Sequence, residues 1–202
     1  MSSKRSLPTG ILIGVIAAFI LGVSGLIVIG LAQRSHSELP ELGSLPDFEF
    51  INQDGAPFGL AQMKGKISIV DFIFTNCPTI CPPMSGNMQT LYNQFENVDK
   101  IQFVSITVDP ERDSTPRLRE YADAYGADPQ RWLFLTGAKD TIAALATDGF
   151  HSGSKDDPIL HSTLFAIVDR KGHICNYYHS DDPELIQKVI ADVAVLARDR
   201  GI

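Results

Sequence analysis

The sequence predicts an α/β domain built around a largely parallel sheet. Short apolar runs rich in β-branched and aromatic residues alternate along the chain with segments in which apolar residues recur every three or four positions. The first pattern is typical of buried strands and the second of amphipathic helices. Because a strand, a helix and a second strand in succession form a right-handed crossover, their repeated alternation favours parallel neighbours in one sheet.

The expected elements follow one another from residue 47. Phenylalanines flank an Asp-Gly turn at residues 52–55, which indicates a first hairpin. A second hairpin surrounds the turn at residues 169–172, and Asp182 caps a final helix. The remaining expected elements are strands at 66–74, 101–108, 132–135, 163–168 and 174–178, and helices beginning near Pro82, at 116–125 and at 141–146.

Two cysteines, Cys77 and Cys81, follow the central strand at the point where Pro82 and Pro83 open the next helix. The free N–H groups and the dipole of a helix start stabilise negative charge, and the thiolate is the form of cysteine that attacks disulfides and binds metals. We therefore expect both thiols to be reactive rather than inert. A β-α-β core closed by a hairpin and a helix, with cysteines after the first core strand, is the layout of a thioredoxin-like domain.

An uncharged stretch of 22 residues, 11–32, indicates one N-terminal transmembrane helix. At about 1.5 Å per residue, such a helix crosses a hydrocarbon core of about 30 Å. The apolar region of a cleavable signal peptide has only about 7 to 15 residues, so an uncleaved anchor is favoured, with cleavage near Ala32 left open. Lys4 and Arg5 precede the stretch, and the positive-inside rule therefore keeps residues 1–10 in the cytoplasm.

The rest of the chain is then expected on the periplasmic side of a bacterial inner membrane. Residues 33–46 are polar and contain prolines, as a tether does, and residues 47–202 form the domain. No Arg-rich amphipathic presequence precedes the anchor, which disfavours a mitochondrial precursor. The chain has 24 acidic and 17 basic residues, and three of the basic ones precede residue 35. The acidic domain repels phosphate backbones, which argues against nucleic acid as a partner.

Three short motifs, in the same order along the chain, make it similar to the Sco/SenC family. They are residues 74–82 (FTNCPTICP), residues 108–113 (VDPERD), and a histidine, His161, just before a strand. That family consists of membrane-anchored copper-binding proteins of thioredoxin-like fold that take part in cytochrome c oxidase assembly. The resemblance spans about residues 44 to 198 and includes the single N-terminal anchor.

The resemblance implies that Cys77, Cys81 and His161 bind copper. The chemistry of this set supports the implication, because soft copper(I) takes few ligands and prefers thiolates and imidazole, although the same ligands suit zinc. The chain departs from the family pattern at Thr79, where an acidic residue is frequent between the cysteines, and at Leu160, where an aspartate often precedes the histidine. Both departures bear on metal affinity.

Two functions follow from these residues. In the first, the chain is a metallochaperone that holds copper, as Cu(I), Cu(II) or both, and passes it to an acceptor such as the copper A site in subunit II of cytochrome c oxidase. In the second, Cys77 or Cys81 attacks a disulfide or reduces the cysteines of an acceptor without stable metal, as a thiol-disulfide oxidoreductase does. A thiol peroxidase is the weakest alternative, and the sequence leaves a homodimer open.

Several other side chains have two interpretations each. Burial of Asp71 in the apolar strand is expected to raise its pKa and let it exchange a proton with a thiol, unless the sheet hydrogen-bonds its carboxyl. Asp109, at a strand end, is either a copper contact or a loop residue that accepts backbone N–H groups. The helical spacing of Met84 and Met88 favours core packing over soft copper ligation. Cys175 is expected to be a packed thiol.

The remaining histidines have no central role in this interpretation. His36 lies in the expected tether. His151, His173 and His179 fall in or near loops among polar residues, and we expect them at the surface. Of these, His151 is the candidate for an accessory metal contact, because its loop leads to His161.

Overall fold

The computed structural model describes three ranges of the chain: residues 19–24, 39–152 and 163–198. The chain divides into two compact units, residues 1–38 and residues 39–202. In the first unit, residues 19–24 are helical. No helix within the described residues is long and apolar enough to cross a membrane. Most of the expected anchor at residues 11–32 lies outside the described residues, and the anchor stays a prediction.

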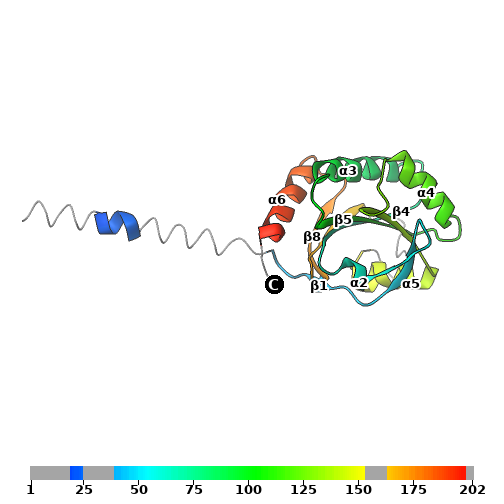
Figure 1. The fold of residues 1–202 in the computed structure, drawn as a ribbon, viewed down its shortest axis with the longest axis horizontal. Helices are drawn as coiled ribbons and strands as arrows, with labels where there is room; N and C mark the ends of the chain where they lie inside the picture. Colours follow the sequence, from blue (N-terminus) through cyan, green and yellow to red (C-terminus); the bar gives the residue numbers. More distant parts are fainter. Residues whose placement is uncertain (1–18, 25–38, 153–162, 199–202) are drawn as a thin grey trace, which may run out of the picture. The chain divides into compact units, whose positions relative to one another are not determined.

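The second unit, called the folded unit below, is built on one sheet of eight strands (Figure 1). The strands lie in the order β1-β8-β7-β4-β5-β6-β2-β3. Their bounds are β1 (Gly43–Ser44), β2 (Glu49–Asn52), β3 (Pro57–Gly59), β4 (Ile67–Ile73), β5 (Ile101–Thr107), β6 (Trp132–Thr136), β7 (Leu164–Val168) and β8 (His173–His179).

The centre of the sheet is parallel and its flanks are antiparallel. β4 pairs in parallel with β5, and β5 with β6, as the alternation of strands and helices predicts. β7 pairs antiparallel with β4, β8 with β7, and β2 with β6. Every residue of β4 and β5 is buried, because helices cover both faces of the sheet. The predicted α/β fold class is confirmed, and both expected hairpins are present.

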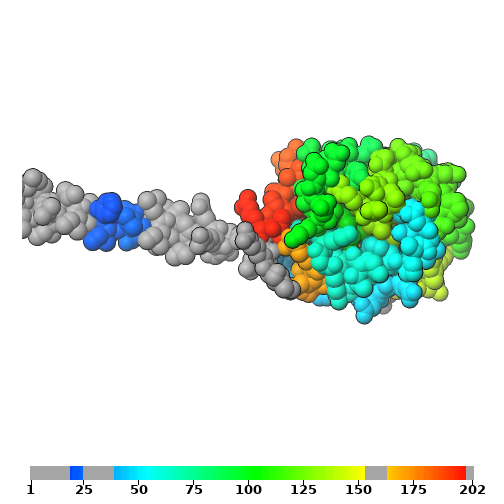
Figure 2. All heavy atoms as spheres, in the orientation of Figure 1, coloured from blue at the N-terminus to red at the C-terminus, as the bar shows by residue number. Residues whose placement is uncertain are grey.

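The helices of the folded unit divide between the two faces of the sheet. α3, α4 and α6 lie over one face, and α2 and α5 over the other (Figure 1). Figure 2 shows α6, in red, beside α3, in green, on the surface. A π-helical turn, Leu145–Gly149, continues α5. The helix bounds are α2 (Leu60–Met63), α3 (Cys81–Gln94), α4 (Thr115–Ala124), α5 (Lys139–Ala144) and α6 (Leu185–Arg198).

Local sequence signals explain where these helices begin and end. Pro82 and Pro83 lie in the first turn of α3 and Pro116 in the first turn of α4, where a missing N–H costs no helical hydrogen bond. Gly126 follows α4 with a φ of +67°, a left-handed conformation that ends the helix. Asp182 accepts the N–H of Glu184 through Oδ1 at 2.8 Å, but α6 begins at Leu185, so this bond lies in the turn before the helix rather than at its expected cap.

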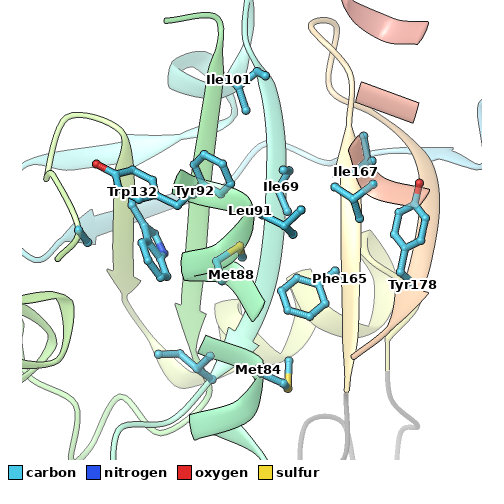
Figure 3. Close-up of a cluster of buried hydrophobic side chains, with 14 of the residues drawn as sticks. Ile69, Met84, Met88, Leu91, Tyr92, Ile101, Trp132, Phe165, Ile167 and Tyr178 are labelled. Carbon is cyan, nitrogen blue, oxygen red and sulfur yellow. The ribbon is translucent and has the colours of Figure 1, made fainter. Parts of the chain in front are cut away.

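The apolar side of α3 fills the core between α3 and the sheet. Met84 and Met88 point from α3 into this core (Figure 3), and their exposed fractions are 1% and 0%. Tyr92, one turn further on, packs against Trp132 of β6 with ring centroids 5.5 Å apart. The interpretation of both methionines as core residues is confirmed, because neither side chain is accessible to a passing copper ion.

The folded unit begins before the expected domain start at residue 47. Gly43–Ser44 forms β1, which pairs antiparallel with β8, and Leu45 is buried with an exposed fraction of 5%. The expected tether, residues 33–46, is therefore wrong from residue 39 onward, and its first six residues lie outside the described part of the chain. A strand of two residues is too short to show an apolar period, so composition alone misplaced this boundary.

The core position of Met88 gives a test of this packing. We expect Met88→Ala to lower the free energy of unfolding by about 2 to 5 kcal/mol, because it leaves a cavity under α3. Met88→Leu nearly conserves volume and should cost less than about 1.5 kcal/mol. Urea unfolding of both variants measures the difference, with Val98→Ala as an exposed control. Equal stability of Met88→Ala and the parent would contradict the packing described above.

Candidate metal centre

The cysteine segment joins the end of β4 to the start of α3. β4 ends at Ile73 inside the sheet and α3 begins at Cys81, so residues 74–80 cross the edge where the parallel strands end. Open α/β sheets bind their ligands at this edge. Cys77 is half-buried and Cys81 is buried, and both are free thiols. The structure therefore brings the two expected sulfur ligands to one turn.

The start of α3 stabilises the thiolate of Cys77. The backbone N–H of Cys81 donates to Sγ of Cys77 at 3.3 Å. Burial by itself raises the pKa of Cys77, but the N–H groups of Cys81, Thr79 and Ile80 outweigh it and lower the pKa from 9.0 to about 7. Cys77 is therefore substantially ionised at neutral pH, as a nucleophile or a metal ligand must be.

Cys81 has the opposite protonation behaviour. Burial raises the pKa of its thiol from 9.0 to about 12, and the nearby negative charges of Cys77 and Asp71 add to the increase. The prediction that both thiols are reactive is therefore wrong for Cys81 in the metal-free chain. Both cysteines stand near a helix start, but the side chain of Cys81 turns into the core, with 5% of its surface exposed.

Asp71, in β4, is a buried acid whose charge acts on Cys81. Its side chain is fully buried, and neither carboxylate oxygen has a hydrogen-bond partner among the described residues. Burial raises its pKa from 3.8 to about 7, and Ser105, opposite on β5, offsets part of the increase without a hydrogen bond of good geometry. The predicted rise in pKa is confirmed, and the alternative of a carboxyl satisfied by the sheet is not.

A second aspartate, Asp113, fixes the entrance to the cysteine segment, and the sequence interpretation missed it. Its carboxylate accepts the N–H of Thr75 at 3.0 Å and the hydroxyl of Thr75 at 2.6 Å. It also accepts the hydroxyl of Thr107 at 2.5 Å, from the end of β5. Asp113 is 1% exposed, so these donors stabilise a carboxylate that is out of contact with water.

The other candidate residues lie in varied surroundings. The carboxylate of Asp109 lies 3.4 Å from the guanidinium of Arg112, and its backbone N–H donates to the hydroxyl of Thr107 at 3.0 Å. Cys175 is buried and free, as expected for a packed thiol, and burial raises its pKa to about 11. A methyl group on Gly43 would lie 3.5 Å from Nε2 of His151, which places that histidine beside β1.

The third expected ligand, His161, lies outside the described residues, as do Leu160 and His36. The structure therefore does not test whether His161 lies near the two thiols. His179 is exposed, as expected, but His173 is not a simple surface residue, because 24% of its side chain is exposed and its Nδ1 atom is buried.

An α/β sheet of this topology, with a thiol pair between its central strand and the following helix, defines the class of thioredoxin-like thiol proteins. Within that class, the chain belongs to the SCO1/SenC family, whose sequence model matches residues 38–198. The thioredoxin-like layout and the family resemblance derived from the sequence are therefore confirmed.

Individual relatives support the same assignment. The SCO1 protein homolog of Bacillus subtilis is 35% identical over 153 residues, which are 72% of this chain and 79% of that protein. The solved structure of BsSco, described as a member of the Sco family of cytochrome c oxidase assembly proteins with a disulfide switch, has a TM-score of 0.70 and 30% identity over 81% of this chain and 99% of that one. Yeast Sco1 with copper bound has a TM-score of 0.61 and 27% identity over 78% of this chain and 95% of that one.

The two thiol pKa values predict different alkylation profiles in the reduced, metal-free protein. We expect modification of Cys77 by iodoacetamide to increase with pH around a midpoint near 7, and Cys81 to stay unmodified there, because its pKa is about 12. Mass spectrometry of the parent and of Cys81→Ser measures both rates, with buried Cys175 as an internal control. A Cys77 midpoint near 9, that of a free thiol, would refute the role assigned to the start of α3.

Asp71 should make stability depend on pH. Because its folded pKa is raised, the native state binds more protons between about pH 4 and about pH 7, and the contribution of Asp71 to stability falls as pH rises through this window. Asn stays neutral, so the stability of Asp71→Asn relative to the parent should increase across the window, by roughly 1.4 kcal/mol per unit of pKa shift. Urea unfolding near pH 5 and pH 8 measures this, with exposed Asp99→Asn as the control. A relative stability that does not change with pH would exclude the raised pKa.

Proposed function

We propose that this chain is a copper metallochaperone that holds copper through Cys77, Cys81 and His161 and delivers it to an acceptor. The observation that carries the proposal is the pair of thiols at the carboxyl edge of the sheet, one of which has a pKa lowered to about 7. Thiolates and an imidazole suit copper(I), which is soft and takes few ligands. A related protein, yeast Sco1, has been solved with copper bound.

The topology of the sheet supports His161 as the third ligand. β7 runs antiparallel to β4, and Phe165 of β7 pairs with Asp71 of β4. The start of β7 therefore lies beside the end of β4, where the cysteine segment begins. His161 precedes Leu164, the first residue of β7, by three residues, and three residues of extended chain span at most about 11 Å.

The acceptor in this proposal is a copper site in an assembling oxidase, such as the copper A site in subunit II of cytochrome c oxidase. The support is the family: BsSco is a member of a family of cytochrome c oxidase assembly proteins. We also propose that residues 11–32 anchor the chain in a bacterial inner membrane, with the folded unit in the periplasm. The support is the uncharged length of this stretch and the basic residues before it.

The second candidate is a thiol-disulfide oxidoreductase, and the difference between the two thiols favours it. The ionised Cys77 is suited to attack a disulfide, and the protonated Cys81 is suited to resolve the mixed disulfide after losing its proton. Asp71 is a buried acid whose charge acts on Cys81, and its pKa of about 7 lets it take up a proton at neutral pH. BsSco, whose structure is related, has a disulfide switch.

A titration with copper(I) under reducing conditions, against a competing chelator, separates the two functions. We expect the full chain to bind one copper ion, and His161→Ala to bind it at least about tenfold more weakly, because one of three ligands is lost. His179→Ala, an exposed histidine on β8, is the matched control and should bind like the parent.

A different result in the same titration would favour the oxidoreductase function. If His161→Ala binds copper as tightly as the parent, and reduction of a disulfide substrate requires Cys77 and Cys81, the oxidoreductase function replaces the chaperone function. Both assays use the same purified protein, so a folding defect in His161→Ala would appear as a loss in both.

A further inference from the structure

A second group of metal-binding side chains lies at the edge of the sheet where β1 pairs with β8. It consists of Glu41, which precedes β1, Asp169, which follows β7, and His173, the first residue of β8; we call it the edge cluster. One ligand atom from each residue lies within 4.8 Å of the others. The pairing of Ser44 with His173 brings the segment of Glu41 to this position. The edge cluster shares no residue with the proposed copper site.

The distances inside the edge cluster fit a bound cation. Nδ1 of His173 lies 3.3 Å from Oε1 of Glu41 and 3.3 Å from Oδ2 of Asp169. Ordinary N–H···O hydrogen bonds are shorter, about 2.7 to 3.2 Å. Nitrogen and oxygen ligands at about 2.0 to 2.2 Å from a tetrahedral zinc ion are about 3.3 to 3.5 Å from each other. The two distances to Nδ1 of His173 therefore match the spacing of ligands around an ion, and the ligand atoms of Glu41 and Asp169 lie within 4.8 Å of each other.

The imidazole of His173 faces the two carboxylates with a buried atom, Nδ1. This atom makes no hydrogen bond among the described residues, and its two carboxylate neighbours at 3.3 Å pair with it only when the imidazole is protonated. A buried nitrogen without a hydrogen bond costs free energy, and a metal ion held between it and the carboxylates is one way to satisfy it.

The turn between β7 and β8 holds two of the three ligands in place before an ion binds. Oδ1 of Asp169 accepts the backbone N–H groups of Lys171 and of His173, each at 2.8 Å. Gly172, with a φ of +95°, closes this turn. These bonds occupy one carboxylate oxygen and leave Oδ2 facing His173, with side chains that are 16% and 24% exposed. Glu41, which is 62% exposed, is the ligand that completes the set.

We propose that the edge cluster is a second metal site, which binds a divalent cation of the zinc class through Nδ1 of His173, Oε1 of Glu41 and Oδ2 of Asp169. Three protein ligands leave the fourth tetrahedral position to water. Imidazole and carboxylate are borderline and hard ligands, so the site favours Zn²⁺ or Cu²⁺ and disfavours Cu⁺, which prefers thiolates.

A bound ion at this place fastens the start of the folded unit. β1 has two residues, and its attachment to the sheet includes a hydrogen bond from Leu42 N–H to Ile174 at 2.7 Å and one from Leu45 N–H to Gly172 at 3.0 Å. Glu41 is the residue immediately before Leu42, so a metal bridge from Glu41 to His173 ties this short strand to β8. The amides of Leu42 and Leu45 should then exchange with solvent more slowly when zinc is bound.

The experiment is a calorimetric titration of ZnCl₂ into the full chain carrying Cys77→Ser and Cys81→Ser, which removes the thiolates of the proposed copper site. We expect one zinc ion per chain, and slower hydrogen exchange at Leu42 and Leu45 when it binds. Glu41→Gln in this background should weaken zinc at least about tenfold. Asp169→Asn should do so too, while its amide oxygen still accepts the two N–H groups of the turn.

Glu49→Gln, a neutralised glutamate exposed on β2, is the matched control and should leave zinc affinity unchanged. Absence of zinc binding in the Cys77→Ser, Cys81→Ser background overturns the proposal. Zinc binding that Glu41→Gln leaves unchanged overturns it as well, because the ion would then be held by other residues. Both results leave the copper proposal untouched, since that site depends on the two cysteines removed here.

Discussion

The hydrogen bonds to Asp113 are the constraint on which the geometry of the cysteine segment depends. β4 and β5 are parallel neighbours, so the loops after both strands leave the sheet at the same edge. Asp113, in the loop after β5, binds Thr75, in the loop after β4, through both a backbone N–H and a hydroxyl. A buried carboxylate is costly unless donors surround it, and each donor here is oriented by a strand end or a loop. The loop that contains Cys77 is therefore held at its first residues by a group 38 positions further along the chain.

This attachment decides how α3 meets the two sulfurs. With Thr75 fixed, the chain turns over five residues before the N–H of Cys81 reaches Sγ of Cys77. The turn exposes part of Cys77 and directs Cys81 into the core under α3. The two pKa values separate for two reasons: the N–H groups of residues 79–81 stabilise the thiolate of Cys77, whereas burial and the charges of Cys77 and Asp71 raise the pKa of Cys81.

The strands and helices could be predicted because they are long enough to show a period. The run of apolar residues predicted β4 within a few positions of its observed bounds. The spacing of apolar residues three or four apart did the same for α3 and α6. β1 could not be found in this way, since two residues have no period and the strand exists only because β8 offers an open edge. The π-helical turn after α5 was missed for a similar reason: its five residues read as the end of an ordinary helix.

For the candidate site, the sequence predicts which residue types come together but not how the fold changes their protonation. Cys77 and Cys81 are visible as a pair because their spacing and the following prolines are local features. Their unequal protonation is harder to predict, because it depends on which thiol accepts the N–H groups of residues 79–81 and on which one the fold buries. Asp113 was visible in the motif VDPERD, but its partners Thr75 and Thr107 come from two different strand ends, so only the fold identifies its role.

The burial of Asp71 gives a reason why copper uptake and thiol chemistry need not be separate properties. A thiol must lose its proton to bind a metal, so a ligand with a pKa near 12 opposes binding at neutral pH. The charge of Asp71 raises that pKa, and by reciprocity the loss of the Cys81 proton favours protonation of Asp71. Asp71, with a pKa of about 7, is a much weaker base than the Cys81 thiolate, so its effect on the thiol is electrostatic: once Asp71 is protonated, the charge that raises the pKa of Cys81 is gone. The same coupling applies when Cys81 attacks a disulfide, so under either proposed function the charge of Asp71 bears on the ionisation of Cys81.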